Sequence, residues 1–177
     1  MDGYEFLKVS SLRNKLKEEI EYAETIVDTK GGVFNTASLQ ANIFCIAALS
    51  RGILEYLPDK DSYTIEVVER STDKHCSKNI SLYSLLGKMV HYIEYMPHYN
   101  DVLSVADIKS IRLISDHDKK HYGIKMRVIS LPEFFKLART LVDSVKPLLV
   151  ETQKRFKAEE GKIMAEALEA VRKHENT

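Results

Sequence analysis

The chain has 177 residues, of which 44% are hydrophobic, and this length and composition suit one domain with a single core. They exclude collagen-like, wholly disordered and membrane-spanning architectures. Lys and Arg total 26, as do Asp and Glu, so the zero net charge excludes extensive DNA binding through a global basic field. Low Gly and Pro counts and the lack of a leader-like apolar run predict a mostly helical, cytoplasmic protein.

Hydrophobic residues at three- and four-residue spacing predict two long helices in the N-terminal part of the chain. The first covers residues 4–28. The second covers residues 36–57 and ends before Pro58. Because few polar residues interrupt the second helix, we expect it to be central, and we expect Cys45 to be a buried small hydrophobe within it.

The middle of the chain mixes strand and helix signals. Residues 62–70 are β-branched and partly alternating, which predicts a short strand, and the polar run 71–79 predicts a mobile loop after it. The hydrophobic period over residues 80–96 predicts a helix. A capping box opens the segment 104–114, which predicts one more helix.

The C-terminal part predicts a strand and two helices. Residues 124–128 alternate, and this second strand can pair with the first as a two-stranded ribbon. A capping box with an early proline predicts a helix start at Ser130. The expected fold class is all-α, a mostly helical bundle over residues 1–147, followed by a C-terminal helical arm over residues 148–177 that suits exposure or dimerisation.

One polar cluster, at the end of the helix predicted to reach residue 114, holds most of the residues that could carry chemistry. Arg112 precedes His117 with four residues between them. Histidine titrates near neutral pH and suits general acid–base catalysis, and the guanidinium fork matches phosphate oxygens. The supporting candidates around this pair are Asp116, Asp118, Lys120, His121 and Tyr122.

The Arg-x4-His spacing, with a helix after it, resembles the catalytic motif of the HEPN superfamily, and the resemblance extends loosely over residues 4–147. It implies a helical bundle that cleaves RNA without a metal or cofactor, often in toxin or antiviral-defence systems. His117 would then transfer protons around the attacking 2′-hydroxyl or the leaving oxygen, while Arg112 would hold the scissile phosphate. The resemblance also implies a homodimer, and a cognate antitoxin or defence-system protein as a further partner.

Other interpretations remain open. The same spacing occurs at Arg70 and His75, where the predicted strand passes into a loop and no apolar helix positions the pair. The arginine of the preferred pair can instead form an ion pair with Asp116 on a solvated helix end, which would leave a non-catalytic nucleotide- or partner-binding module. In a third interpretation His117 and His121 are metal ligands of a hydrolase, although no third ligand is identifiable.

Overall fold

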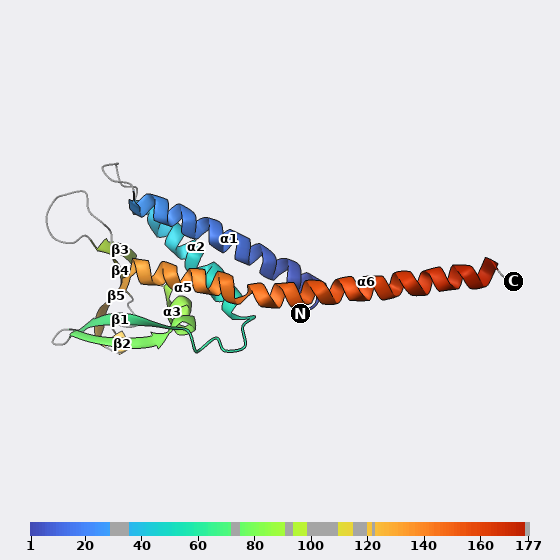
Figure 1. Ribbon diagram of the computed structural model, residues 1–177. Coiled ribbons are helices and arrows are strands. Elements are labelled where there is room, and N and C mark those ends of the chain that lie inside the picture. The colour runs from blue at the N-terminus through green and yellow to red at the C-terminus, as the bar shows by residue number, and fades with distance from the viewer. Residues whose placement is uncertain are drawn as a thin grey trace.

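The computed structural model combines helices with a five-stranded antiparallel sheet (Figure 1). The mostly helical character predicted from the sequence is confirmed, but the sheet is larger than a two-stranded ribbon. The structure describes residues 1–28, 36–71, 75–90, 94–98, 110–114, 120–121 and 123–175. The elements are α1 (Gly3–Asp28), α2 (Thr36–Leu54), β1 (Thr64–Ser71), β2 (His75–Ser81), α3 (Leu82–Met89), β3 (Glu94–His98), β4 (Ser110–Ile114), β5 (Ile124–Ser130), α5 (Leu131–Ser144) and α6 (Lys146–Glu175).

The two long helices that the hydrophobic spacing predicts are confirmed as α1 and α2, and they form an antiparallel pair. Asn42 of α2 donates a hydrogen bond to Glu19 of α1, and Gly52 lies against Leu12 nearer the other end of the pair. The central place predicted for α2 is confirmed, because it packs against α1, α3 and α5. The burial predicted for Cys45 is wrong, since its side chain is exposed. The helix is apolar on more than one face, and periodicity does not tell which face meets the core.

The first predicted strand is confirmed as β1, but the loop predicted after it is wrong over much of its length. Residues 75–81 form β2, which pairs antiparallel with β1. The strand is at one edge of the sheet, and residues 76–79 are exposed. An exposed edge strand has no apolar face to bury, so its sequence shows no alternation and looks like a polar loop.

Two predicted helices are wrong in part, and residues 104–109 of the second lie outside the described residues. The helix predicted over residues 80–96 ends with α3 at Met89, and residues 94–98 form the edge strand β3. Where the sequence predicts a helix up to residue 114, residues 110–114 form β4. Isoleucines spaced by three suggest a helix there, but Ile111 and Leu113 alternate with less buried residues and point into the core as a strand requires.

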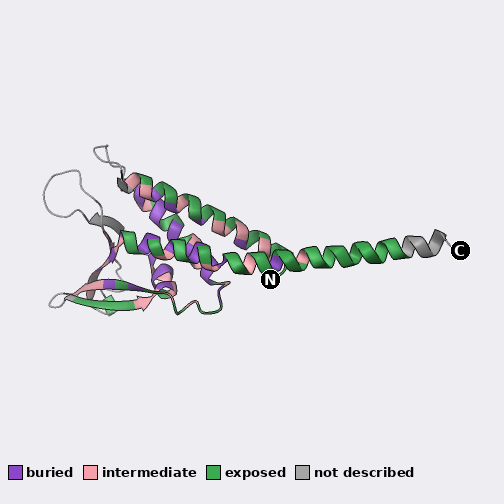
Figure 2. Ribbon diagram, in the orientation of Figure 1, coloured by how far each residue is buried: buried purple, intermediate pink, exposed green. Residues whose placement is uncertain are grey.

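The C-terminal predictions hold better. The strand β5 pairs antiparallel with β1, as predicted, and also with β4. Ser130 caps α5, its side chain accepting a hydrogen bond from the backbone N–H of Glu133, and Pro132 lies in the first turn. The next helix, α6, extends away from the body, and residues 157–169 of it are exposed (Figure 2). It is attached near its start, where Thr152 is buried and Phe156 packs edge-on against Phe6.

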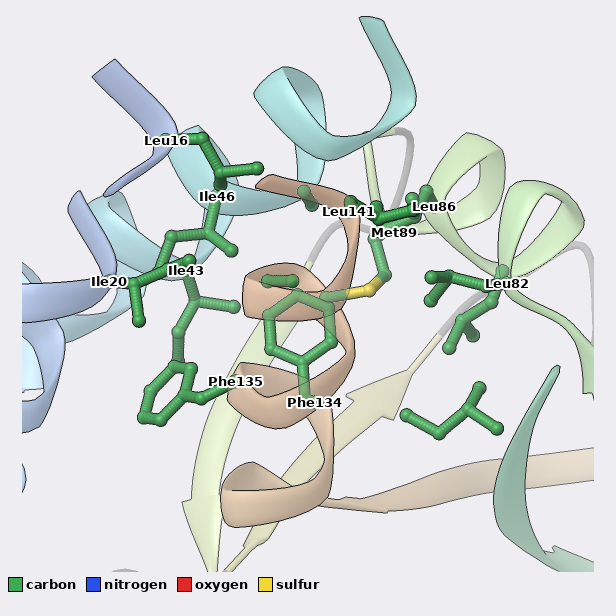
Figure 3. Close-up of a cluster of buried hydrophobic side chains, with 14 of the residues drawn as sticks. Leu16, Ile20, Ile43, Ile46, Leu82, Leu86, Met89, Phe134, Phe135 and Leu141 are labelled. Atoms are coloured by element: carbon green, nitrogen blue, oxygen red, sulfur yellow. The ribbon is translucent and has the colours of Figure 1, made fainter. Parts of the chain in front are cut away.

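The core lies between the helices and one face of the sheet. Phe134 of α5 stands at its centre and is 1% exposed (Figure 3). α1 contributes Leu16 and Ile20 to this core, and α3 contributes Leu82 and Met89. This packing leaves the helices on one side of the sheet, so the two faces of the sheet have different surroundings.

Candidate functional site

The alternation of the three central strands separates an inner face from an outer face. Inner positions are buried, and outer positions are partly exposed. The inner apolar residues are Ile65, Val67, Ile111, Leu113 and Ile129. The outer side chains of the same strands include Val68, Arg70, Arg112, Met126 and Val128. Two arginines therefore lie on the face away from the helices.

The inner face also holds an arginine, and this one is paired. The Arg127 side chain is 4% exposed, and its Nε donates a hydrogen bond of 2.9 Å to Oε1 of Glu69. Nζ of Lys78 is 2.8 Å from the other oxygen of that carboxylate. Burial raises the pKa of Glu69, but the hydrogen bonds from Lys78 and Arg127 outweigh burial and leave the pKa below its ordinary value. The charged groups of Glu69, Lys78 and Arg127 are therefore paired with one another within the fold.

Arg70 and Arg112, on the outer face, have different surroundings. The Nε atoms of both are buried, and neither has a hydrogen-bond partner in the part of the chain that the structure describes. A buried N–H without a partner costs about 1–3 kcal/mol, and more for a charged group. Each of these two side chains therefore carries a buried Nε donor that no described residue satisfies.

The register brings these arginines close to each other. Val68, Val128 and Arg112 form one row across β1, β5 and β4, and Arg70 lies in the next outward-facing row, beside Met126. Two strand spacings and one two-residue step correspond to about 12 Å between the Cα atoms of Arg70 and Arg112. Extended guanidinium groups at that separation can contact one anionic group or two neighbouring ones. The outer face is thus a candidate phosphate-binding surface.

The candidates predicted from the sequence are only partly covered by the described residues. Arg112 lies in a strand, not at the helix end that the sequence predicts. Lys120 and His121 are exposed. Outside the described residues lie His117 and three of its supporting candidates, Asp116, Asp118 and Tyr122. The pairing of the catalytic dyad therefore stays a prediction.

The structure changes the local setting of both arginines in the two Arg-x4-His pairs and leaves the choice between the pairs untested. The sequence favours Arg112 because a capped helix is expected to position it, and that helix is absent from residues 110–114. The other pair does not run from a strand into a loop, because Arg70 and His75 are register partners in the β1–β2 hairpin. The missed signal is the alternation in residues 110–114, and the register through β5 then places Arg70 and Arg112 on the same side of the sheet.

A hollow of about 480 Å³ lies beside the helices, away from these arginines in the fold. It runs along the outer side of α5, with Glu24 of α1 at one wall and Leu131, Phe135 and Lys136 among the lining residues. Its arginine, Arg139, is hydrogen-bonded to Glu24, which raises the pKa of the guanidinium. That arginine is thus committed to a carboxylate of the same chain, unlike those on the outer face of the sheet.

Among the residues that the structure describes, no three His, Cys, Asp or Glu side chains form a group that could hold a metal ion. His117 is not among them, so the two-histidine interpretation stays untested. None of the helices in the described ranges combines the length and hydropathy that crossing a bilayer requires.

Comparison of the sequence with protein-family models gives no match. Comparisons with curated proteins and with solved structures also give no match. The functional argument therefore depends on the residues themselves.

Proposed function

We propose that the protein is a metal-independent endoribonuclease that binds the phosphates of RNA on the outer face of its sheet. The observation that carries the proposal is the pair of arginines, Arg70 and Arg112, whose buried Nε atoms lack partners among the described residues. An RNA phosphodiester supplies the acceptors that these donors require, and guanidinium groups bind phosphate oxygens in a fork geometry. The neutral overall charge suits binding through a local site of this kind.

In the proposed reaction, His117 and Arg112 are the catalytic pair. His117 accepts the proton of a ribose 2′-hydroxyl, and the 2′-oxygen attacks the adjacent phosphorus. The bond from phosphorus to the 5′-oxygen breaks, and that oxygen takes up a proton, which leaves a 2′,3′-cyclic phosphate and a 5′-hydroxyl. Arg112 stabilises the negative charge that develops on the phosphate oxygens. Arg70 binds the same or a neighbouring phosphate.

The proposal also includes the oligomeric state of the protein and its biological role. HEPN-like ribonucleases, which this chain resembles in its Arg-x4-His spacing, place one motif from each of two subunits at a shared site. We propose a homodimer for this reason, since two-fold symmetry is the commonest way to bring two copies of a weak site together. A toxin or antiviral-defence role in the cytoplasm, with an antitoxin or another defence protein as partner, completes the proposal.

One observation favours a second candidate function. Arg112 lies within a strand, with Val128 of β5 as its neighbour, whereas the HEPN resemblance implies a helical setting for the motif. An arginine on a sheet can bind phosphate without any acid–base partner. The second candidate is therefore a non-catalytic RNA- or nucleotide-binding module that uses the same outer face.

The test is incubation of purified protein with end-labelled RNA in the presence of a chelator. We expect cleavage that leaves 2′,3′-cyclic phosphate ends, and we expect His117→Ala to lower the rate by about a hundred- to ten-thousand-fold. Arg112→Ala should be nearly as damaging, and the double variant should fall far short of the product of the two effects. Arg70→Ala should weaken RNA binding, because Arg70 lies on the same face.

His75→Ala is the matched control, because it removes a histidine at the same spacing from an arginine. Its cleavage rate should stay close to that of the unmodified protein. An inactive His75 variant beside an active His117 variant would move the catalytic role to the β1–β2 hairpin. RNA binding that depends on both arginines, without any cleavage, would establish the binding module in place of the nuclease.

A further inference from the structure

Lys88 lies close to the ion pairs of Glu69 on the inner face of the sheet. It belongs to the last turn of α3. Partial burial lowers its pKa, the charges of Arg127 and Lys78 lower it further, and the charge of Glu69 acts in the opposite direction. The four groups are therefore near enough for their charges to act on one another, and we call Lys78, Lys88, Arg127 and Glu69 the inner-face cluster.

The inner-face cluster has more positive than negative charge. Its ionised groups are three cations and one carboxylate. Both oxygens of that carboxylate are already engaged, Oε1 by Arg127 at 2.9 Å and Oε2 by Lys78 at 2.8 Å. Lys88 thus lies beside two other cations in a partly buried place, where like charges repel one another more strongly than they do in water.

Other charged groups of the described chain are balanced by carboxylates. Lys15 lies near both Glu18 and Glu19, and Arg139 is hydrogen-bonded to Glu24. A further anion bound beside the inner-face cluster would give it a similar balance of charge.

The excess positive charge can be reached from solvent. The Lys78 side chain is 45% exposed and comes from β2, an edge strand of the sheet (Figure 1). Lys88 is partly exposed, whereas the Arg127 side chain is 4% exposed. An anion that arrives from solvent would therefore contact the two lysines, and Arg127 would attract it through its charge.

We propose that the inner-face cluster binds a phosphate dianion, either as the free ion or as the terminal phosphate of a monoester. Such a group carries a charge of about −1.5 to −2 near pH 7, which matches the excess charge of the cluster. An internal phosphodiester of RNA carries a single negative charge and matches it less well. Ammonium groups bind phosphate oxygens through charge-assisted hydrogen bonds. The site is separate from the outer face, and the inference does not rest on RNA cleavage.

The experiment is a calorimetric titration of the full chain at pH 7 and constant ionic strength. The probes are inorganic phosphate and glycerol 1-phosphate, with chloride as the balancing anion. The titrated chain carries Arg70→Met and Arg112→Met, so that phosphate binding on the outer face does not contribute. We expect one ion of each probe to bind per chain.

The decisive variant in this background is Lys88→Met. It should raise the dissociation constant about ten- to a hundredfold, because hydrogen bonds to charged groups contribute that much. It should also fold, since it removes a cation that other cations repel. Lys88→Arg keeps the charge and should retain most of the affinity. Lys154→Met, at an exposed position of α6, is the matched control and should bind as the background protein does.

A second measurement uses the unmodified protein. Acetic anhydride acetylates accessible amines, and mass spectrometry measures the extent at each lysine. Inorganic phosphate should protect Lys78 and Lys88, and it should leave the acetylation of Lys154 unchanged. This result does not depend on how well any variant folds.

Three results would overturn the inference. They are the lack of binding of either probe in the background protein, binding that Lys88→Met leaves intact, and equal losses in Lys88→Met and Lys154→Met. Binding of inorganic phosphate alone would identify the ligand as the free ion, and binding of both probes would extend it to terminal monoesters. Failure of the nuclease proposal is recognised separately, because RNA cleavage is measured in a different assay.

Discussion

Arg127 and Arg112 lie on adjacent strands of one sheet, one register position apart, yet they face opposite sides and have opposite surroundings. Arg127 is on the inner face and is bonded to Glu69, whereas the Nε of Arg112 is buried on the outer face and lacks a partner among the described residues. Where the chain supplies the carboxylate, the arginine stabilises the fold. Where no described residue supplies one, we propose that an RNA phosphate is the acceptor, so substitutions on the two faces should affect different properties.

The largest effect on stability is expected from Glu69→Gln. The substitution replaces the carboxylate that accepts from the buried guanidinium of Arg127 by a neutral amide, and a hydrogen bond to a charged group is worth about 1.5–3 kcal/mol. Urea denaturation should show this as a lower midpoint with an unchanged slope. Lys78→Met is the control, because Lys78 is 45% exposed and its loss should cost less than about 1 kcal/mol. Equal losses in the two variants would contradict the special role of the buried pair.

Arg112→Met and Arg70→Met should weaken RNA binding and leave the stability of the fold nearly unchanged, the reverse of the effect expected for Glu69→Gln. Each removes a buried unpartnered donor, so the free energy of unfolding should change by less than about 1 kcal/mol or rise slightly. RNA affinity should fall by about 1.5–3 kcal/mol for each variant, since hydrogen bonds to charged groups are worth that much. A salt titration of RNA binding should lose about one unit of slope per arginine.

The exposed Lys154→Met serves as the comparison for these two variants. Lys154 lies on α6, away from the sheet, so its loss should change affinity less than either arginine variant. Large losses of stability with unchanged RNA affinity would show that Arg70 and Arg112 belong to the fold, like Arg127.

A smaller effect is expected at Gly123, just before β5. Gly123 precedes β5 and has φ of 64°, a left-handed conformation that costs an L-residue about 1–2 kcal/mol. Gly123→Ala should destabilise by that amount, although no atom within 4 Å would meet the new Cβ. Gly161→Ala, equally free of neighbours but within α6, should instead stabilise by about 1 kcal/mol. A thermal melt of both variants distinguishes backbone strain from crowding.

The last prediction is a pH dependence carried by Glu69 on the inner face. The pKa of Glu69 is lowered in the folded state from an ordinary value of 4.5, so its ionised form favours folding above that pH. The contribution should disappear as the pH falls through the lowered pKa. Unfolding free energies measured between pH 7 and roughly pH 2 should therefore decline less steeply in Glu69→Gln than in the unmodified protein. If the unfolding free energies of the two proteins decline in parallel, the acid sensitivity comes from other carboxylates.

The sequence predicts the long helices well because each has local signals. Ser130 and Pro132 mark the start of α5, and the spacing of Leu16, Ile20 and Ala23 marks the buried side of α1. The sheet is harder to predict because its pairings are long-range. In β4 a spacing of three between isoleucines matches a helix, and only contact with β3 and β5 selects the alternating pattern of Ile111 and Leu113.

The candidate site shows the same limit. Sequence spacing identifies Arg112 and also Arg70, but choosing between them requires knowing that β1, β5 and β4 are adjacent and that both arginines point outward. The exposure of Cys45 could not be predicted either, because α2 has two apolar faces and local periodicity treats them alike. Residue types were therefore predictable, and their shared location was not.

Pro97 in the strand β3 has a consequence for how the sheet could grow. β3 forms one edge of the sheet, and a proline has no amide hydrogen to offer to an additional strand. Strand addition, whether by a peptide or by aggregating chains, is thus disfavoured at this edge. The opposite edge, β2, has no proline between His75 and Ser81 and exposes residues 76–79. If a peptide ever extends this sheet, β2 is the edge to which it would add.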